Sequence, residues 1–253
     1  MKILIRPDAP AAAARAAEII AARLRAQPGA VLGLATGGTM EAVYGRLIAL
    51  HRAGQVSFAG ATSFNLDEYV GLAGDHPCSY RHYMAEKLFD HIDMRAGAAH
   101  LPRGEAPDAD AEAARYEAAI VAAGDIDLQL LGLGQNGHIG FNEPTSSLAS
   151  VTRPKTLERS TRAANSQYFP DGIEPPRIAI TMGIGTIMRA REVLLVATGA
   201  AKARAVAQVV EGPVSARWPG SVLQMHPRAT LVLDPAAAAE LELAEYYRDI
   251  HPD

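Results

Sequence analysis

The sequence is poor in cysteine, in long apolar runs and in positive charge. Cys78 is the only cysteine among 253 residues, which excludes an intrachain disulfide and any zinc site built on several thiolates. The net charge of −4 argues against a broad basic surface for nucleic acid. No apolar stretch reaches the roughly 20 residues that cross a bilayer, and the N-terminus MKILIRPDAP meets charge and proline too early for a secretion signal. We therefore expect a cytoplasmic protein without nucleic-acid or membrane partners.

Segments with strand-like and helix-like patterns alternate along the whole chain. The expected strands are 2–6, 31–35, 61–66, 126–133, 178–183, 192–198 and 229–234. The expected helices are 10–27, 39–54, 79–92, 109–124, 200–212 and 235–249. This alternation predicts an α/β fold, with a mostly parallel Rossmann-like sheet and helices on both faces, in a single domain spanning 1–253. Ligands of such sheets bind at the carboxyl ends of the strands, so the connecting loops are the place to look for chemistry.

The first such loop is ATGGTM, residues 35–40, between a predicted strand and a predicted helix. Gly37 and Gly38 allow the backbone to approach a ligand closely, and Thr39 can cap the helix. The free N–H groups and the positive end of the helix dipole would then form a pocket for a phosphate. A tight strand–helix turn with a threonine cap is an equally good interpretation of this motif alone.

The second loop, FNLDEYVGL at residues 64–72, carries two adjacent carboxylates just past a strand end. In extended backbone Asp67 and Glu68 point in opposite directions, so only one of them can face a ligand. One is a candidate base and the other a structural contact. Alternatively, the pair is a solvated acidic turn.

The third loop, GLGQNGHIGFNEP at residues 132–144, begins with the dinucleotide fingerprint G-x-G-x-x-G. That site needs a helix to start at the glycines, whereas Pro144 disfavours helical geometry at Glu143. We expect a loop in which the chain folds back and brings His138 and Glu143 together as an acid–base pair, because a carboxylate favours and orients the imidazolium. A purely structural histidine is the alternative.

The motifs give little support for a metal site or for a serine hydrolase. The third loop supplies one histidine and one glutamate, which do not complete a ligand set, and no HxxxH or HExxH spacing occurs. No G-x-S-x-G motif marks a serine hydrolase. We therefore expect no metal site in this loop.

Five segments occur in a recognisable order: TGGT (36–39), FNLDEYVGL (64–72), GLGQNGHIGFNEPTSSLAS (132–150), TRAANSQYF (161–169) and VEGPVSARWPGSVLQMHP (210–227). Together they resemble the glucosamine-6-phosphate deaminase family, also called glucosamine-6-phosphate isomerases. The resemblance covers residues 30 to 235 approximately, and the DEY and NGHIGFNEP motifs are specific in combination. It implies an enzyme that opens the ring of glucosamine 6-phosphate, isomerises the sugar and releases ammonia, giving fructose 6-phosphate, without a metal or an organic cofactor.

The resemblance also implies roles for individual residues. Asp67 matches the base that moves a proton from C2 to C1 of the opened sugar. His138 matches the group that shuttles a proton during ring opening, with Asn136 and Glu143 as its polar partners. The residues that match phosphate contacts are Thr36, Gly37, Gly38, Thr39, Gly137 and Lys202.

Two positions depart from the family pattern. Some members carry Asp where this chain has Asn136, so that Glu143 alone supplies charge to the imidazole. The family often places a phosphate-clamping Arg in the NSxF segment, where this chain has Gln167, which replaces a charged bidentate contact by a neutral one. Lys202 and the TGGT amides remain, and Arg162 is a candidate substitute.

Some relatives are hexamers activated by N-acetylglucosamine 6-phosphate, at a site in the region that corresponds to Ser146, Arg153 and Lys155. The chain keeps Arg153 and Lys155 but ends soon after AEYYRDIHPD. We therefore expect weak or no activation and a monomer or small homo-oligomer. The alternative for Arg153 and Lys155 is a solvated basic pair.

Three other functions compete with glucosamine-6-phosphate deamination. One is the same reaction on a related amino sugar phosphate such as galactosamine 6-phosphate, since epimer preference depends on the shape of the pocket. Another is a 6-phosphogluconolactonase-like hydrolase, which has no use for a base at C2. The third is a sugar-phosphate sensor without catalysis, against which the retention of Asp67, His138 and Glu143 argues.

Overall fold

A computed structural model describes residues 1–170 and 173–252. Its main sheet has seven strands in the order β1-β10-β9-β6-β2-β3-β5, and every pair of neighbours in it is parallel. The strands are β1 (Lys2–Ile5), β10 (Ala229–Leu233), β9 (Glu192–Ala197), β6 (Leu128–Leu131), β2 (Val31–Leu34), β3 (Thr62–Asn65) and β5 (Ala99–His100). The predicted α/β fold with a mostly parallel sheet is confirmed.

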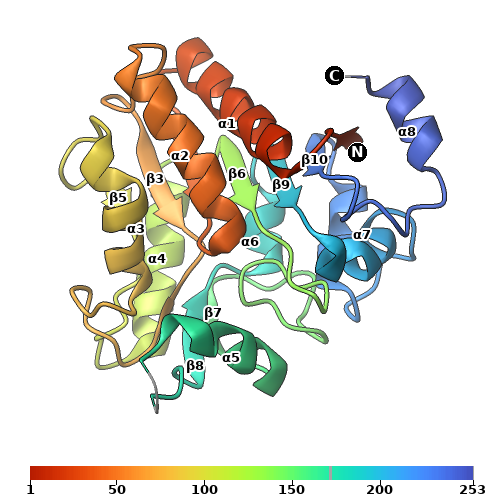
Figure 1. Ribbon diagram of the computed structural model, residues 1–253. Helices are drawn as coiled ribbons and strands as arrows, with labels where there is room; N and C mark the ends of the chain where they lie inside the picture. Colours follow the sequence, from red (N-terminus) through yellow and green to blue (C-terminus); the bar gives the residue numbers. More distant parts are fainter. Residues whose placement is uncertain (171–172, 253) are drawn as a thin grey trace.

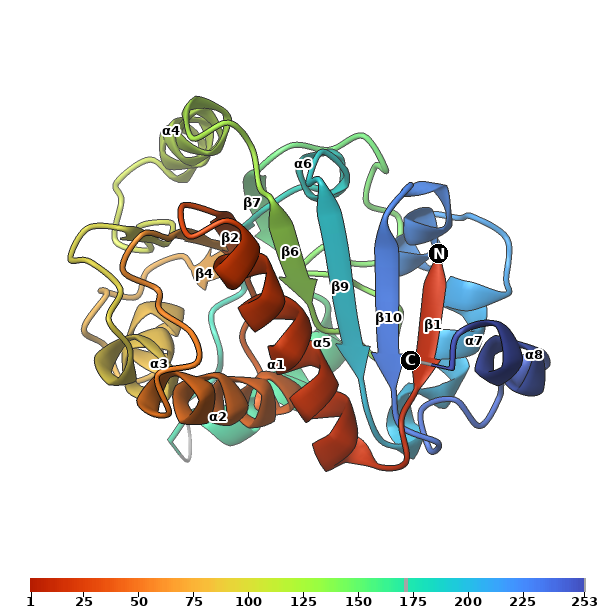
Figure 2. The same cartoon turned by 90° about the horizontal axis from the view of Figure 1, so that it is seen from above.

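Helices cover both faces of this sheet. Figure 1 shows α1 (Ala9–Ala26) and α2 (Gly38–Arg52) on one side, with α4 (Ala109–Ala122), α6 (Ile184–Met188) and α7 (Ala203–Val210) on the other. The view from above places α8 (Ala244–Ile250) beside β1, close to both ends of the chain (Figure 2). Because both faces are covered, the central strands are buried on both sides, as in the VLGL run of β2 and the LQLL run of β6. No helix in the described ranges is long and apolar enough to cross a membrane.

A second, three-stranded sheet has the order β4-β8-β7 and is antiparallel. Its strands are β4 (Asp67–Tyr69), β8 (Ile178–Thr181) and β7 (Arg153–Thr156). The sequence analysis placed segment 178–183 in the parallel sheet and did not expect β4 or β7 as strands. Residues 178–181 pair instead with the short DEY and RPKT strands, which lack a long apolar run. Helix α5 (Arg159–Asn165) follows β7 and was also not expected.

The expected helices differ from the observed ones mainly at the C-terminus. The helix predicted at 235–249 is wrong over its first half, where residues 235–240 form turns and only α8 is helical. Asp234 accepts a hydrogen bond from the Ala237 N–H at 2.8 Å, while the N–H groups of Glu242 and Leu243 donate to Glu211. These side-chain hydrogen bonds replace helical backbone bonds where the chain turns. Ala237 is buried in this turn.

Two of the other predicted helices are shortened by 3₁₀ turns. Segment 79–92 becomes α3 (Tyr80–Lys87) and a 3₁₀ turn at Phe89–His91. Segment 200–212 begins with a 3₁₀ turn at Ala200–Lys202 before α7. A further 3₁₀ segment, Pro219–Met225, lies after α7.

The middle of the main sheet contains a buried polar side chain that requires a glycine beside it. Gln129 of β6 is fully buried, and its Nε2 donates to the Leu130 carbonyl at 2.8 Å. Its amide lies over Gly33 of β2, where an added Cβ would overlap the Gln129 amide. Since the amide is fully buried, it has no free space into which it can move.

We expect Gly33→Ala to lower the free energy of unfolding by about 1–3 kcal/mol, because the new methyl group overpacks the sheet. Gly45→Ala is the matched control, since Gly45 is exposed within α2 and an added Cβ meets nothing within 4 Å. That change should raise the free energy of unfolding by roughly 0.5–1 kcal/mol. Urea unfolding measures both, and equal effects of the two substitutions would contradict the packing argument.

Candidate active site

The predicted loops surround one cavity of about 690 Å³ at the carboxyl ends of the parallel strands. The turn after β2, the residues after β3, the loop after β6 and the turn after β9 all contribute to its wall. The sequence-predicted residues among its lining are Thr36, Gly37, Gly38, Thr39, Asp67, Asn136, His138, Gln167 and Lys202. Asp67, His138 and the glycine turn therefore converge on a single cavity.

The glycine turn presents the uncapped start of α2 to the cavity. Gly37 has φ +112°, a left-handed conformation that favours glycine, and it occupies the N-cap position without any side-chain cap. The predicted cap by Thr39 is wrong, because the helix already begins at Gly38. The Tyr83 hydroxyl donates to the Gly37 carbonyl at 3.0 Å and fixes the turn. The first N–H groups of α2 are thus open to an anion, and the 15-residue helix adds its dipole.

Asp67 and Glu68 point in opposite directions from β4, as extended backbone requires. Asp67 is buried and lines the cavity. Glu68 turns away and accepts the N–H groups of Tyr69, Tyr80 and Arg81, each at 2.9 Å. Glu68 therefore holds the start of α3, while Asp67 is the carboxylate available for chemistry.

The surroundings of Asp67 strongly favour its protonated form. Burial, and then the neighbouring Glu68 carboxylate, raise the pKa of Asp67 to about 8. Gly140 lies beside it, and an added Cβ there would be 3.6 Å from Asp67 Oδ2. A carboxylate that is costly to ionise is a strong base once ionised, which suits abstraction of a proton from carbon.

The His138 loop contains no helix between residues 132 and 151, so the dinucleotide interpretation stays excluded. The glycines of this loop leave room for side chains that pack against it. The His138 ring packs on Gly134, where any Cβ would overlap the imidazole. Gly137 was expected to contact phosphate, but it lies outside the lining and packs against Trp218, whose Cε3 would be 2.6 Å from an added Cβ. Arg204 and Arg217 lie over the Trp218 ring at 5.9 and 5.8 Å.

His138 and Glu143 meet as the sequence analysis expected. His138 Nδ1 lies 3.4 Å from Glu143 Oε2, within reach for an ion pair but too long for a strong hydrogen bond. Burial alone would raise the pKa of Glu143, yet the His138 imidazole, the Thr161 hydroxyl and the Asn136 amide lower it to about 2. Glu143 is therefore an anion that orients the ring, while the ring faces the cavity.

Lys202 brings positive charge to the cavity from the turn after β9. Gly199, with φ +87°, donates its N–H to Asp234 Oδ1 at 3.0 Å, and its carbonyl accepts the Lys202 N–H at 3.0 Å. Burial lowers the pKa of the Lys202 ammonium, and no carboxylate of the described residues pairs with it. A desolvated cation without an anionic partner suits a phosphate ligand.

Gln167 lines the same cavity without adding charge to it. Its Nε2 donates to the Ala164 carbonyl at 2.8 Å. Arg162 does not take its place, because that side chain lies outside the lining and pairs with Glu174 at 3.4 Å. The described wall of the cavity is therefore less positive than the family pattern suggests.

An aromatic group behind Asp67 was missed by the sequence analysis. It consists of Tyr69, Tyr80, Phe141 and Phe169, with ring centroids 4.9–6.0 Å apart in the contacting pairs. The Tyr69 hydroxyl accepts hydrogen bonds from Tyr80 at 3.2 Å and Asn165 at 2.9 Å. Tyr69, Phe141 and Phe169 lie within the quoted motifs, but only the antiparallel sheet and α5 bring them together.

The candidate effector residues attach to the same loop. Ser146 is buried, and its N–H donates to the Glu143 carbonyl at 3.0 Å. Arg153 Nη1 donates to Asn142 Oδ1 at 2.9 Å, and Lys155 lies two residues further along β7 on the same face of the strand. An effector role for these residues stays a prediction.

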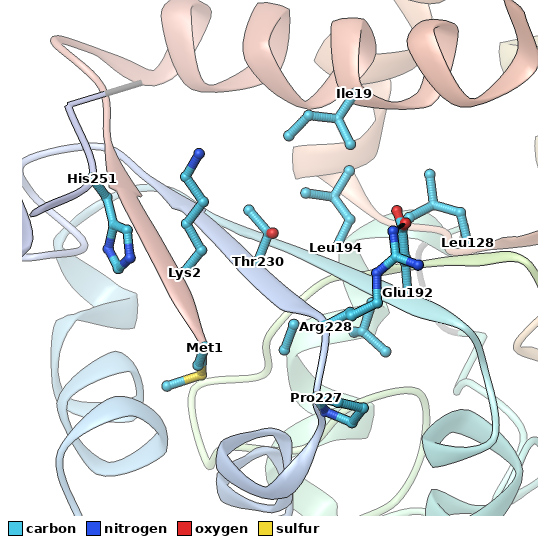
Figure 3. A pocket seen from close by; sticks show the side chains of 12 residues that line it. Met1, Lys2, Ile19, Leu128, Glu192, Leu194, Pro227, Arg228, Thr230 and His251 are labelled. Atoms are coloured by element: carbon cyan, nitrogen blue, oxygen red, sulfur yellow. Dashed lines mark hydrogen bonds and ion pairs between the residues drawn. The ribbon is translucent and has the colours of Figure 1, made fainter. Parts of the chain in front are cut away.

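A second hollow of about 370 Å³ lies at the opposite, amino-terminal ends of β1, β10 and β9 (Figure 3). Its charged groups are largely satisfied, since Glu192 pairs with both Arg23 and Arg228. His251 Nδ1 accepts the Ile3 N–H at 3.3 Å. Parallel sheets bind ligands at their carboxyl ends, so the larger cavity is the candidate active site. Among residues 1–170 and 173–252, no group of three or more His, Cys, Asp or Glu side chains is arranged to hold a metal ion.

Comparisons with known proteins agree on the family. The model of the family of glucosamine-6-phosphate isomerases and 6-phosphogluconolactonase matches residues 8–232. Glucosamine-6-phosphate deaminase of Shewanella loihica is 52% identical over 253 residues, covering 100% of this chain and 94% of its own. That of Hahella chejuensis is 53% identical over 248 residues, covering 98% and 95%. The solved structure of a monomeric glucosamine-6-phosphate deaminase superposes with a TM-score of 0.92 at 45% identity, covering 95% of this chain and 100% of that one.

The raised pKa of Asp67 has a consequence for stability. Folding disfavours the Asp67 carboxylate, so the stability penalty accumulates as the pH rises from the usual pKa of 3.8 to about 8. Asp67→Asn, a neutral mimic of the protonated acid, should therefore raise the free energy of unfolding by on the order of 1–3 kcal/mol near pH 9.

The same substitution should have a smaller effect near pH 5, because the penalty has accumulated there over only about one pH unit above the usual pKa of 3.8. Urea unfolding of both proteins at the two pH values measures this difference. A stability difference that does not change with pH would contradict the assignment of the raised pKa to Asp67.

Proposed function

This chain belongs to the family of glucosamine-6-phosphate isomerases and 6-phosphogluconolactonases, and we propose that it acts as a glucosamine-6-phosphate deaminase. The reaction converts D-glucosamine 6-phosphate and water into D-fructose 6-phosphate and ammonia. The observation that carries the proposal is the buried Asp67 carboxyl group, which faces the cavity that His138 also faces. The high identity to the two deaminases over the full chain supports the same choice.

The substrate's phosphate binds where the cavity offers positive potential. The uncapped start of α2 at Gly37 and Gly38 provides N–H donors, and Lys202 provides a point charge. Thr36 and Thr39 add hydroxyl groups on the same wall. With the phosphate held at this end, the sugar extends across the cavity towards Asp67 and His138.

Ring opening requires a group that takes a proton from one oxygen and delivers it to another. His138 takes the proton from the hydroxyl at C1 and returns it to the ring oxygen as the bond between C1 and that oxygen breaks. Glu143 stabilises the imidazolium that forms in between and fixes which ring nitrogen faces the sugar. Asn136 holds Glu143 in place through its Nδ2, at 2.8 Å.

Isomerisation then moves one proton between neighbouring carbons. Asp67 removes the C2 proton of the open-chain sugar and returns it to C1, while one proton of the C2 ammonium group passes to the oxygen at C1. The resulting iminium group at C2 reacts with water to release ammonia. The substrate's ammonium group at C2 favours the Asp67 carboxylate, which offsets the burial that raises its pKa. Substrate binding thus helps to ionise the base that attacks the substrate.

A lactonase reaction has no step for this carboxylate. Hydrolysis of a lactone needs a water molecule and a proton shuttle, but no group that abstracts a proton from C2. The burial of Asp67 would then be a cost to folding without a benefit to catalysis. The same argument weighs against a sensor that binds a sugar phosphate without turnover.

We also infer a cytoplasmic monomer or small homo-oligomer with weak or no allosteric activation. The monomeric deaminase whose fold matches this chain supports the low oligomeric state. A charged sugar phosphate does not cross membranes unaided, which supports action inside the cell.

The proposal is tested by ammonia release from a panel of 6-phosphorylated sugars: glucosamine, galactosamine and N-acetylglucosamine 6-phosphates, with 6-phosphogluconolactone hydrolysis assayed alongside. We expect turnover of glucosamine 6-phosphate, and a loss of at least about 10³-fold in kcat for Asp67→Asn, because its amide cannot accept the C2 proton. Lactone hydrolysis without ammonia release, or binding without turnover, would overturn the proposal.

Gln167→Arg tests the weaker phosphate wall. A charged, bidentate contact to the phosphate should lower KM for glucosamine 6-phosphate by about fivefold to tenfold, with little change in kcat. Gln167→Lys separates the effect of charge from that of bidentate geometry, since lysine adds a cation but cannot form the paired hydrogen bonds of a guanidinium group. Steady-state kinetics at low ionic strength measure both variants, and an unchanged or raised KM for Gln167→Arg would remove the idea.

A further inference from the structure

Asn136 bridges two carboxylates that come from different parts of the chain. Its Nδ2 donates to Glu143 Oε2 and to Glu158 Oε2, each at 2.8 Å. Its Oδ1 accepts the His138 N–H at 3.2 Å. Both amide protons and the amide oxygen are therefore engaged, and this pattern fixes the orientation of the side chain.

Glu158 connects this bridge to helix α5. It occupies the N-cap position of α5, and its own N–H donates to Glu143 Oε1 at 3.3 Å. Thr161, in the first turn of the same helix, hydrogen-bonds the Glu143 carboxylate and helps to lower its pKa. The carboxylate that faces His138 is thus held by Asn136 from one side and by the start of α5 from the other.

We propose that Glu158 is a positioning residue for the proposed deaminase reaction, acting through the amide of Asn136 on the Glu143–His138 pair. This inference rests on the proposed function for its effect on turnover. Glu158 is exposed and does not touch His138 in the structure, so its contribution is to orient Asn136 and not to transfer protons.

The same geometry explains why this chain carries an amide at position 136. An aspartate there would bring a third carboxylate to within hydrogen-bond distance of Glu143 and Glu158, without a proton to share. Like charges at this separation repel each other, and Glu143 is largely buried, so solvent screens the repulsion poorly. Asn136 and Glu158 therefore form a matched pair of donor and acceptor.

Reversing the polarity of the pair tests this inference. The proteins to compare are the unaltered chain, Asn136→Asp, Glu158→Gln and the double variant, in which the amide introduced by Glu158→Gln can donate to the new carboxylate. We expect Asn136→Asp to lower kcat by about tenfold with KM changed less than about threefold. Glu158→Gln alone keeps an acceptor oxygen and should lower kcat less than about threefold. The double variant should recover to within about threefold of Glu158→Gln.

A second measurement does not depend on turnover. Nitrogen-15 NMR reports which ring nitrogen of His138 carries the proton at a pH where the ring is neutral, with the signal assigned by its loss in His138→Gln. We expect the Nδ1–H form, facing Glu143, in the unaltered chain, a mixture of forms in Asn136→Asp, and return of the Nδ1–H form in the double variant. Glu240→Gln, which removes an exposed and distant carboxylate, is the control. Combined with Asn136→Asp, it should restore neither kcat nor the Nδ1–H form of His138.

The two failures are distinguishable. If the unaltered chain releases no ammonia, the proposed function falls, while the NMR comparison still decides whether Glu158 orients the pair. If ammonia is released but the kcat losses of the single variants simply multiply in the double variant, the coupling is absent and the inference is wrong. An unchanged proton position on His138 in Asn136→Asp would also overturn it.

Discussion

The arrangement of the site depends on the cost of burying the Asp67 carboxylate beside Glu68. Neither Asp67 nor Glu68 could be buried in β4 without the elements that pack around this strand. The Glu68 carboxylate accepts N–H groups from its strand neighbour Tyr69 and from Tyr80 and Arg81 at the start of α3, so this second buried carboxylate supports that helix. Asp67 receives no comparable set of donors in the described residues, and its pKa rises accordingly. The small antiparallel sheet holds β4 in place, with Asp67 paired opposite Thr181.

Much of this could be predicted from the sequence, because some patterns are local. The mainly apolar runs of β2, β6 and β9 predict buried parallel strands, and the loops that follow them predict where a ligand binds. Alternation along a strand was enough to separate the directions of Asp67 and Glu68. The proximity of His138 and Glu143 followed from a short loop that Pro144 keeps out of a helix.

What could not be predicted depends on contacts between distant segments. The strands β4 and β7 are too short and too polar to be recognised, and only their pairing with β8 defines them. The capping role assigned to Thr39 failed because the left-handed Gly37 starts the helix earlier than the composition suggests. Gly137 fitted a phosphate motif, but its place is decided by Trp218, which lies about 80 residues further along the chain. The partnership of Asn136 with Glu158 likewise needs the fold to bring α5 against the loop.

The contact between Trp218 and Gly137 has an optical consequence. Trp218 is the only tryptophan of the chain, and it touches the loop that carries His138. All indole emission therefore comes from a side chain that contacts Gly137, the residue before His138. Two guanidinium groups lie over its ring, and their positions affect the intensity of the emission. The protein thus contains a native fluorophore at the His138 loop, so that ligand-induced movement there is observable without attaching any dye.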